Sequence, residues 1–145
     1  MLRKFALATF LLFLLAGCAS VPMGDSGRDN DLKSFASKPG VASIFVYRNE
    51  TMGAAIRMDV SVDGKPLGQT AAKTYLYTEV EPGDHVITSM SENTDRLDIN
   101  AEAGQVYYVW QEVKMGLLYA RTKLHLASEE EGKKGVNESK LAQSN

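Results

Sequence analysis

Residues 57–68 read RMDVSVDGKPLG, and this stretch decides the fold class of the chain. Between residues 57 and 63 polar and apolar side chains alternate strictly, so the apolar ones share one face of an extended strand. Asp63 and Gly64 follow as a turn signal, because glycine accepts the positive φ that a tight β-hairpin needs. The stretch therefore predicts a half-buried strand that ends in a hairpin turn.

Other segments rich in β-branched or aromatic residues have the same extended character. The expected strands are 41–48, 57–63, 74–80, 85–92, 96–101, 106–114 and 119–127. Turn signals at Pro82-Gly83-Asp84 and Ala103-Gly104 separate two pairs of them. Short strands without long helical periods indicate an antiparallel sandwich or barrel. We expect an all-β fold, a small antiparallel β-sandwich of about seven strands over residues 40–127.

The flanks of this domain have a different composition. Residues 18–39 are rich in Ser, Gly, Asp, Asn and Pro, which predicts a flexible tether. In the C-terminal segment 128–145, Ser128 and Glu131 fit a capping box. Gly132 and Gly135 argue against more than a short helix there, and we expect the tail to fray afterwards.

The first 17 residues have the pattern of a secretory signal peptide. Arg3 and Lys4 are basic, an apolar run covers residues 5–15, and Ala16-Gly17 supplies small residues before a cleavage site. A transmembrane helix needs about 20 apolar residues, and this run is shorter. We expect residues 1–17 to be removed.

Leu15-Ala16-Gly17-Cys18 resembles the bacterial lipobox, and Cys18 is the only cysteine of the chain. The resemblance implies cleavage between Gly17 and Cys18 and a covalent lipid, including fatty acyl chains such as palmitate, on the Cys18 residue. Several acyl chains attach a protein lastingly to a bilayer. The alternative is an ordinary signal peptide with a chance cysteine nearby. Ala19, in place of an aspartate, favours an outer-membrane lipoprotein facing the periplasm over the inner membrane.

The order of strands and turns also resembles a bacterial family called domain of unknown function 2846. The segments that carry this resemblance are Ser43–Arg48, Val60–Gly68, Pro82–His85 and Ala103–Val109. The family pattern is similar to small sandwich modules of the PEGA and transthyretin-like kind. It assigns no catalytic residues, so the resemblance implies none for this chain.

The composition offers few groups for chemistry. The 145 residues include 16 Lys plus Arg, 18 Asp plus Glu and two histidines, with no basic stripe for nucleic acid. His85 follows a turn, and His125 alternates with basic residues on an expected solvent face. Metal sites and catalytic triads need a histidine beside its partners. We expect no catalytic residue, no metal and no cofactor other than the lipid on Cys18.

The segment Val106–Trp110 is apolar or aromatic on both faces. Such a strand is either buried on both sides or exposes one apolar face. We expect Tyr108 and Trp110 to be core residues. The alternative is an exposed pair that stacks on sugar rings of peptidoglycan or lipopolysaccharide, or that contacts a protein partner.

These patterns together predict a membrane-anchored periplasmic lipoprotein with a non-catalytic binding or structural role. Its partners would be the bilayer, through Cys18, and an envelope protein or peptidoglycan. A carbohydrate-binding module for an envelope glycan is the alternative. An enzyme would have to build its site from His85 or His125 and scattered carboxylates.

Overall fold

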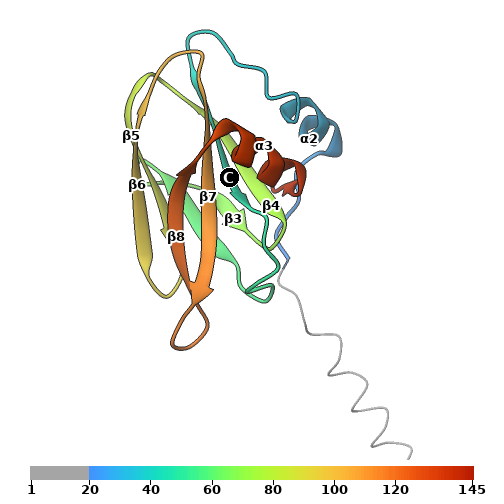
Figure 1. The fold of residues 1–145 in the computed structure, drawn as a ribbon, viewed down its shortest axis with the longest axis vertical. Coiled ribbons are helices and arrows are strands. Elements are labelled where there is room, and N and C mark those ends of the chain that lie inside the picture. Colours follow the sequence, from blue (N-terminus) through green and yellow to red (C-terminus); the bar gives the residue numbers. More distant parts are fainter. Residues whose placement is uncertain (1–19) are drawn as a thin grey trace, which may run out of the picture.

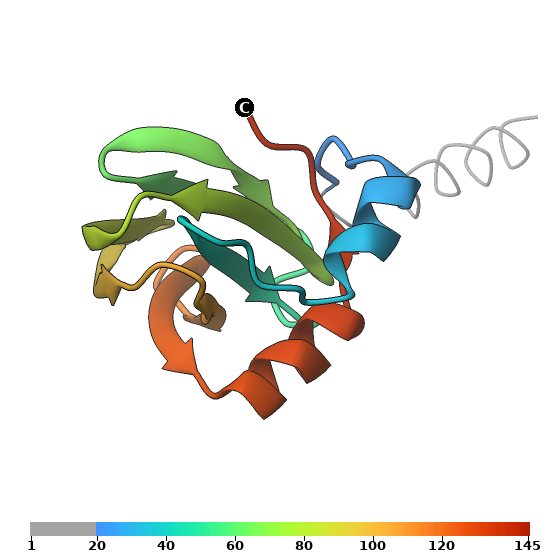
Figure 2. The ribbon, with the colours of Figure 1, turned by 90° about the horizontal axis from the view of Figure 1, so that it is seen from above.

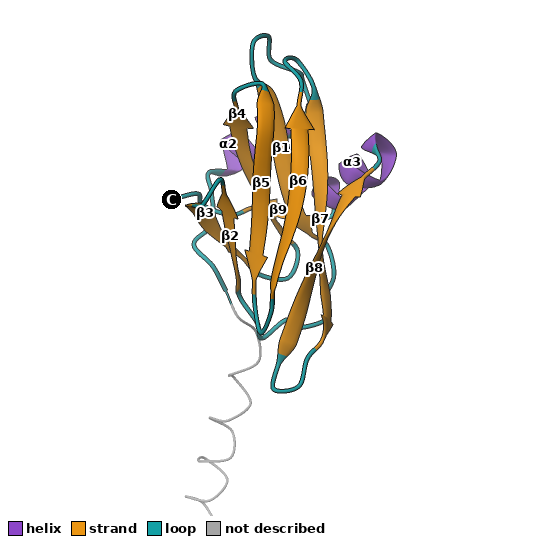
Figure 3. Cartoon of the chain, turned by 90° about the vertical axis from the view of Figure 1, so that its left-hand side faces the viewer, coloured by secondary structure: helices purple, strands orange, loops and turns teal. Residues whose placement is uncertain are grey.

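Two β-sheets packed face to face form the body of the domain, which the computed structural model describes over residues 20–145 (Figure 1). The strands are β1 (Ala42–Arg48), β2 (Met58–Val62), β3 (Lys65–Thr70), β4 (Thr74–Val80), β5 (Gly83–Met90), β6 (Thr94–Ala101), β7 (Val106–Met115), β8 (Ala120–Ala127) and β9 (Lys140–Leu141). The five-stranded sheet has the order β8-β7-β1-β4-β9, and the four-stranded sheet the order β3-β2-β5-β6 (Figure 3). The prediction of a small all-β sandwich is confirmed.

The turn signal of the opening stretch forms the β2–β3 hairpin. Asp63 and Gly64 have φ values of 52° and 78°, and Val62 pairs with Lys65 across the turn. Two consecutive positive φ values are typical of the two-residue turn that matches the twist of a hairpin. Residues 65–70, which were not among the expected strands, therefore form β3 at the edge of the sheet.

Two strand pairs differ from the expected antiparallel arrangement. β1 runs parallel to β7, and β9 runs parallel to β4. The chain leaves β1 for the other sheet before it returns, so no tight turn fixes the direction of either neighbour of β1. Only strands joined by short turns must be antiparallel.

The side chains of β1 alternate between two apolar environments. Ile44 and Val46 point into the core between the sheets, whereas Phe45 and Tyr47 point to the outer face of the five-stranded sheet. Two helices, α2 (Ser26–Leu32) and α3 (Glu129–Asn137), cover that outer face (Figure 2). β1 is consequently buried over its whole length.

The short C-terminal helix lies where the sequence predicted it. The Ser128 hydroxyl accepts a hydrogen bond from the Glu131 N–H at 3.2 Å and caps α3. Gly132 and Gly135 are both buried within the helix, on the side that faces the sheet. The glycines thus mark the docking face of α3.

The expected flexible tether is wrong for the part that the structure describes, residues 20–39. Asp25 caps α2, and the Tyr75 hydroxyl donates a hydrogen bond to Asp29 at 2.5 Å. Leu32 and Phe35 pack against the cluster of aromatic residues on the outer face of the five-stranded sheet, which contains Phe45, Tyr47, Tyr75, Tyr77 and Tyr108. The apolar contacts of Leu32 and Phe35, together with the Asp29 hydrogen bond, hold this polar segment on the apolar outer face of the sheet.

The expected fraying of the tail is also wrong. β9 pairs with β4, and the Ala142 N–H donates to the Tyr75 carbonyl at 2.8 Å. Met23 forms an isolated bridge with Ala142, which joins both ends of the described chain. Within residues 20–145 no helix has the length and apolar character to cross a membrane.

Candidate functional site

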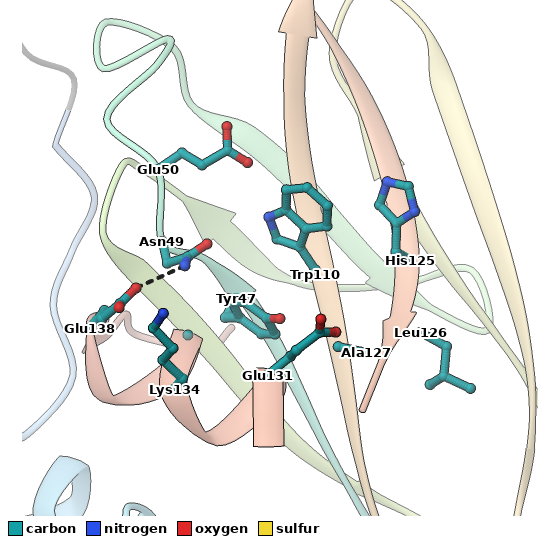
Figure 4. Close-up of a pocket in the computed structure, with 11 residues that line it drawn as sticks. Tyr47, Asn49, Glu50, Trp110, His125, Leu126, Ala127, Glu131, Lys134 and Glu138 are labelled. Atoms are coloured by element: carbon teal, nitrogen blue, oxygen red, sulfur yellow. Dashed lines mark hydrogen bonds between the residues drawn. The ribbon is translucent and has the colours of Figure 1, made fainter. Parts of the chain in front are cut away.

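A pocket of about 540 Å³ opens between α3 and the strands β1, β7 and β8 (Figure 4). We call it the α3 pocket. It is lined by Tyr47, Asn49, Glu50, Trp110, His125, Leu126, Ala127, Glu131, Lys134, Gly135 and Glu138. Its walls combine aromatic rings with carboxylates, which is a common composition for binding sites that fix a polar ligand.

Trp110 and His125 form the aromatic wall of the α3 pocket. They are directly paired residues of β7 and β8, and their rings stack with centroids 4.8 Å apart and planes 25° from parallel. The Nε2 atom of His125 lies 2.6 Å from a carboxylate oxygen of Glu112. This contact fixes the imidazole ring, which in turn supports the indole ring.

Two polar atoms of the α3 pocket lack a partner within the described chain. The indole Nε1 of Trp110 and the Oε1 oxygen of Glu50 are buried and make no hydrogen bond there. Burial raises the pKa of the Glu50 carboxyl, and the nearby Trp110 N–H and Arg48 oppose this rise. The donor and the acceptor are thus neighbours whose geometry does not make a hydrogen bond, and a polar molecule in the pocket would satisfy both.

Helix α3 contributes mostly acidic groups to the α3 pocket. Glu131 and Glu138 project from it, with Lys134 between them, and Asn49 donates a hydrogen bond to Glu138 at 2.9 Å (Figure 4). Burial, followed by the charges of Glu131 and Glu138, raises the pKa of Tyr47 to about 12. Tyr47 therefore keeps its hydroxyl proton at neutral pH.

Comparison with known proteins places this chain in a family. The model of the protein family described as "Protein of unknown function (DUF2846)" matches residues 38–123. The chain belongs to the DUF2846 family. An uncharacterized protein of Haemophilus influenzae is similar to this DUF2846 protein, with 34% identity that covers 97% of this chain and 86% of the relative. No solved structure matches the chain.

In this DUF2846 domain, Tyr108 and Trp110 of β7 lie in different surroundings. Tyr108 is 2% exposed and lies under Phe35, with a ring centroid distance of 5.9 Å, and its ring contacts α3. It is therefore not available for the ligand contact that the alternative interpretation gave it. Trp110 is only half-buried and lines the α3 pocket.

His85 is not among the residues that line the α3 pocket, and it contacts the β2–β3 turn instead. Its ring nitrogens lie 2.6 Å from the Asp63 carboxylate and 2.6 Å from the Glu81 carbonyl oxygen. Both neighbours accept hydrogen bonds, so they favour the doubly protonated ring. The contact with Asp63, followed by that with Glu81, raises the pKa of His85, and it lowers the pKa of Asp63.

The lipobox residues Gly17 and Cys18 lie outside the described residues, so the expected cleavage and lipidation stay predictions.

The sequence analysis missed Glu50, Glu131 and Glu138 as members of one site. They come from a loop, a helix and the end of that helix, and no local spacing links them. Among the residues of the described part, no group of three or more His, Cys, Asp or Glu side chains has the arrangement of a metal site.

Proposed function

We propose that this protein is a lipoprotein anchored by Cys18 in the outer membrane, where its domain serves as a non-catalytic binding module. The Leu15–Cys18 sequence supports the anchoring. The α3 pocket supports the binding role, because the Trp110 N–H and the Oε1 oxygen of Glu50 lie near each other in its wall, buried and without a hydrogen bond of good geometry. This pair of atoms is the observation that carries the proposal.

The contacts of His125 in the α3 pocket support a binding role for this residue. The side chains that line the pocket include no Ser, Thr or Cys that His125 could activate as a nucleophile, within the part of the chain that the structure describes. His125 is instead engaged with Glu112 and stacked on Trp110. Its role in the proposal is to hold the indole ring in place.

Site-specific photocrosslinking in intact cells tests the binding role. A photoreactive amino acid at position 131 lies on the α3 pocket, whereas the same group at position 130 lies on exposed helix outside it. We expect a discrete adduct from position 131 and not from position 130, with mass spectrometry to identify what is captured. Equal adducts from both positions, or none from either, would refute a binding role for the pocket.

An envelope glycan is a second candidate ligand, favoured by the half-buried Trp110 among hydrogen-bonding groups. Aromatic rings with nearby carboxylates and N–H donors suit the apolar faces and hydroxyls of sugars. The mature protein in mild detergent should co-sediment with purified peptidoglycan sacculi. Trp110→Ala and Glu131→Gln should each reduce the bound fraction, while Glu130→Gln should not. Equal sedimentation of all variants would exclude the α3 pocket as a glycan site.

A further inference from the structure

The turn between β7 and β8 presents large apolar side chains to solvent. Met115, Leu117 and Leu118 are 88%, 97% and 88% exposed, and Tyr119 is 52% exposed. We call residues 115–119 the apolar tip. Isolated exposed apolar residues are ordinary, but a contiguous exposed group marks a surface that contacts something apolar.

The backbone of the apolar tip is held in place by the neighbouring turn between β5 and β6. One carboxylate oxygen of Glu92 accepts the Leu118 N–H at 2.8 Å, and the other accepts the Tyr119 N–H at 3.3 Å. The Ser91 hydroxyl donates to the Ala120 carbonyl at 2.8 Å. The exposed side chains therefore stand on an ordered turn, and the N–H groups of Leu118 and Tyr119 are already bonded, which lowers the cost of placing this backbone near lipid.

The apolar tip and the start of the described chain lie toward the same end of the sandwich. β1 and β7 run parallel, so the turns that follow them lie at one end of the sandwich. The described chain begins toward that end, because Met23 bridges Ala142, whose N–H donates to Tyr75 beside the last residues of β1 (Figures 1 and 3). Met52, 58% exposed, lies in the turn after β1. Cys18 is two residues before Ser20 in the sequence, a separation that an extended chain spans in about 7 Å.

Basic side chains flank the apolar tip on both strands. Lys114 and Arg121 are exposed cross-strand partners directly behind it, and Lys114 has a loose contact of 3.9 Å with Glu112. Apolar side chains ahead of a pair of basic residues suit the boundary between acyl chains and anionic headgroups. A protruding turn also fits a fluid bilayer without a complementary pocket on a partner.

We propose that the apolar tip inserts into the interfacial layer of the same membrane that holds the lipid on Cys18. This inference rests on the proposed anchoring function and adds a second contact to it. A single point of attachment leaves a domain free to rotate about it, whereas a second contact fixes its orientation. The apolar tip thus sets which faces of the sandwich point away from the bilayer.

Depth-dependent fluorescence on the whole acylated protein tests the insertion. The protein is purified with its lipid and reconstituted into vesicles of phosphatidylethanolamine and phosphatidylglycerol. Because acylation consumes the only native thiol, Leu118→Cys supplies a unique position for an environment-sensitive dye. Ala103→Cys, exposed on the β6–β7 turn at the opposite end, is the matched control. We expect nitroxide-labelled lipids to quench the dye at position 118 severalfold more than at position 103, and iodide to do the reverse.

The outcomes separate the two proposals. An anchored protein whose dye at position 118 responds like the dye at position 103 would overturn the insertion alone. Protection of position 118 that is already present in detergent, and that grows with protein concentration, would assign the apolar tip to self-association and also overturn it. A chain that does not float with the vesicles and keeps a maleimide-reactive Cys18 would refute the anchoring and, with it, the insertion.

Discussion

Replacing Gly135 by alanine tests whether close packing of α3 on the sheet governs the stability of the domain. A Cβ atom at Gly135 would lie 2.1 Å from Cε2 and 2.5 Å from Cδ2 of the Tyr47 ring. Carbon atoms in favourable contact are about 3.5–4.0 Å apart, so the helix or the ring would have to move by about 1.5 Å. Neither moves freely, because Tyr47 is 4% exposed and the next helix residue, Val136, is fully buried.

The sign of the effect distinguishes packing from helix propensity. Alanine is better than glycine in a helix by about 1 kcal/mol, which alone would stabilise the domain. Overpacking typically costs about 1–3 kcal/mol, and a clash with ring atoms lies at the upper end of that range. We therefore expect Gly135→Ala to lower the free energy of unfolding by about 2 kcal/mol, and to distort the α3 pocket that Gly135 lines.

Urea denaturation of both proteins measures this difference. With an m-value of about 1–3 kcal/mol per molar, the midpoint should fall by roughly 1 M at unchanged m. Gly27→Ala in α2 is the matched control, because its added Cβ meets only the Asp25 carboxylate group at 3.0 Å and should leave the midpoint unchanged or raise it. A rise of the midpoint for Gly135→Ala as well would show that α3 docks loosely, and would refute the reasoning.

Three further changes test separate parts of the interpretation. Cys18→Ser should leave a precursor of higher mass, because a hydroxyl cannot replace the thiol in lipid transfer; normal processing in a mass spectrum would contradict the lipoprotein assignment. Gly64→Val should cost about 1–3 kcal/mol in urea denaturation, because φ is 78° there although the added Cβ meets no atom within 4 Å. His85→Gln should reduce stability most below a pH of about 6.5. The pKa of His85 is raised in the folded state, so its pairing with Asp63 stabilises the fold at low pH, and this contribution is lost as the pH rises through the raised value. A wild-type minus variant difference that is independent of pH would contradict that pairing.

The sequence predicted those elements that rest on local signals. The alternation before Asp63 and the turn at Gly64 act within a few residues, and the Ser128 cap acts within one helical turn. β3 was missed because Pro66 and Gly68 are both unfavourable in strands. The structure places β3 at a sheet edge, where a proline needs no ladder partner for its missing N–H.

Long-range packing could not be predicted in the same way. Arg48 is fully buried at the end of β1 and donates to the carbonyls of Ile56 at 2.7 Å and Gly53 at 2.6 Å. Nothing in its sequence context distinguishes it from an exposed arginine. The α3 pocket depends on similar relationships, since Glu50 and Glu131 are 81 positions apart in the sequence and meet only because α3 folds back onto β1.

The two proposed contacts lie on the same pair of strands, which limits where a ligand of the α3 pocket can be. Trp110 and Met115 are five residues apart on β7, and a strand rises about 3.3 Å per residue, so the pocket lies roughly 17 Å from the apolar tip. If the tip is inserted at the bilayer interface, the pocket is held just above the lipid headgroups.

Trp110 is the only tryptophan of the chain, so its fluorescence reports on this distance without a label on the protein. In the reconstituted protein we expect efficient energy transfer from Trp110 to a dansyl group on the lipid headgroups, and much less transfer for a variant in which Leu117 and Leu118 are both changed to aspartate. Equal transfer for the two proteins would mean that the acyl chains alone determine the position of the domain, and that the α3 pocket is free to reach ligands farther from the membrane.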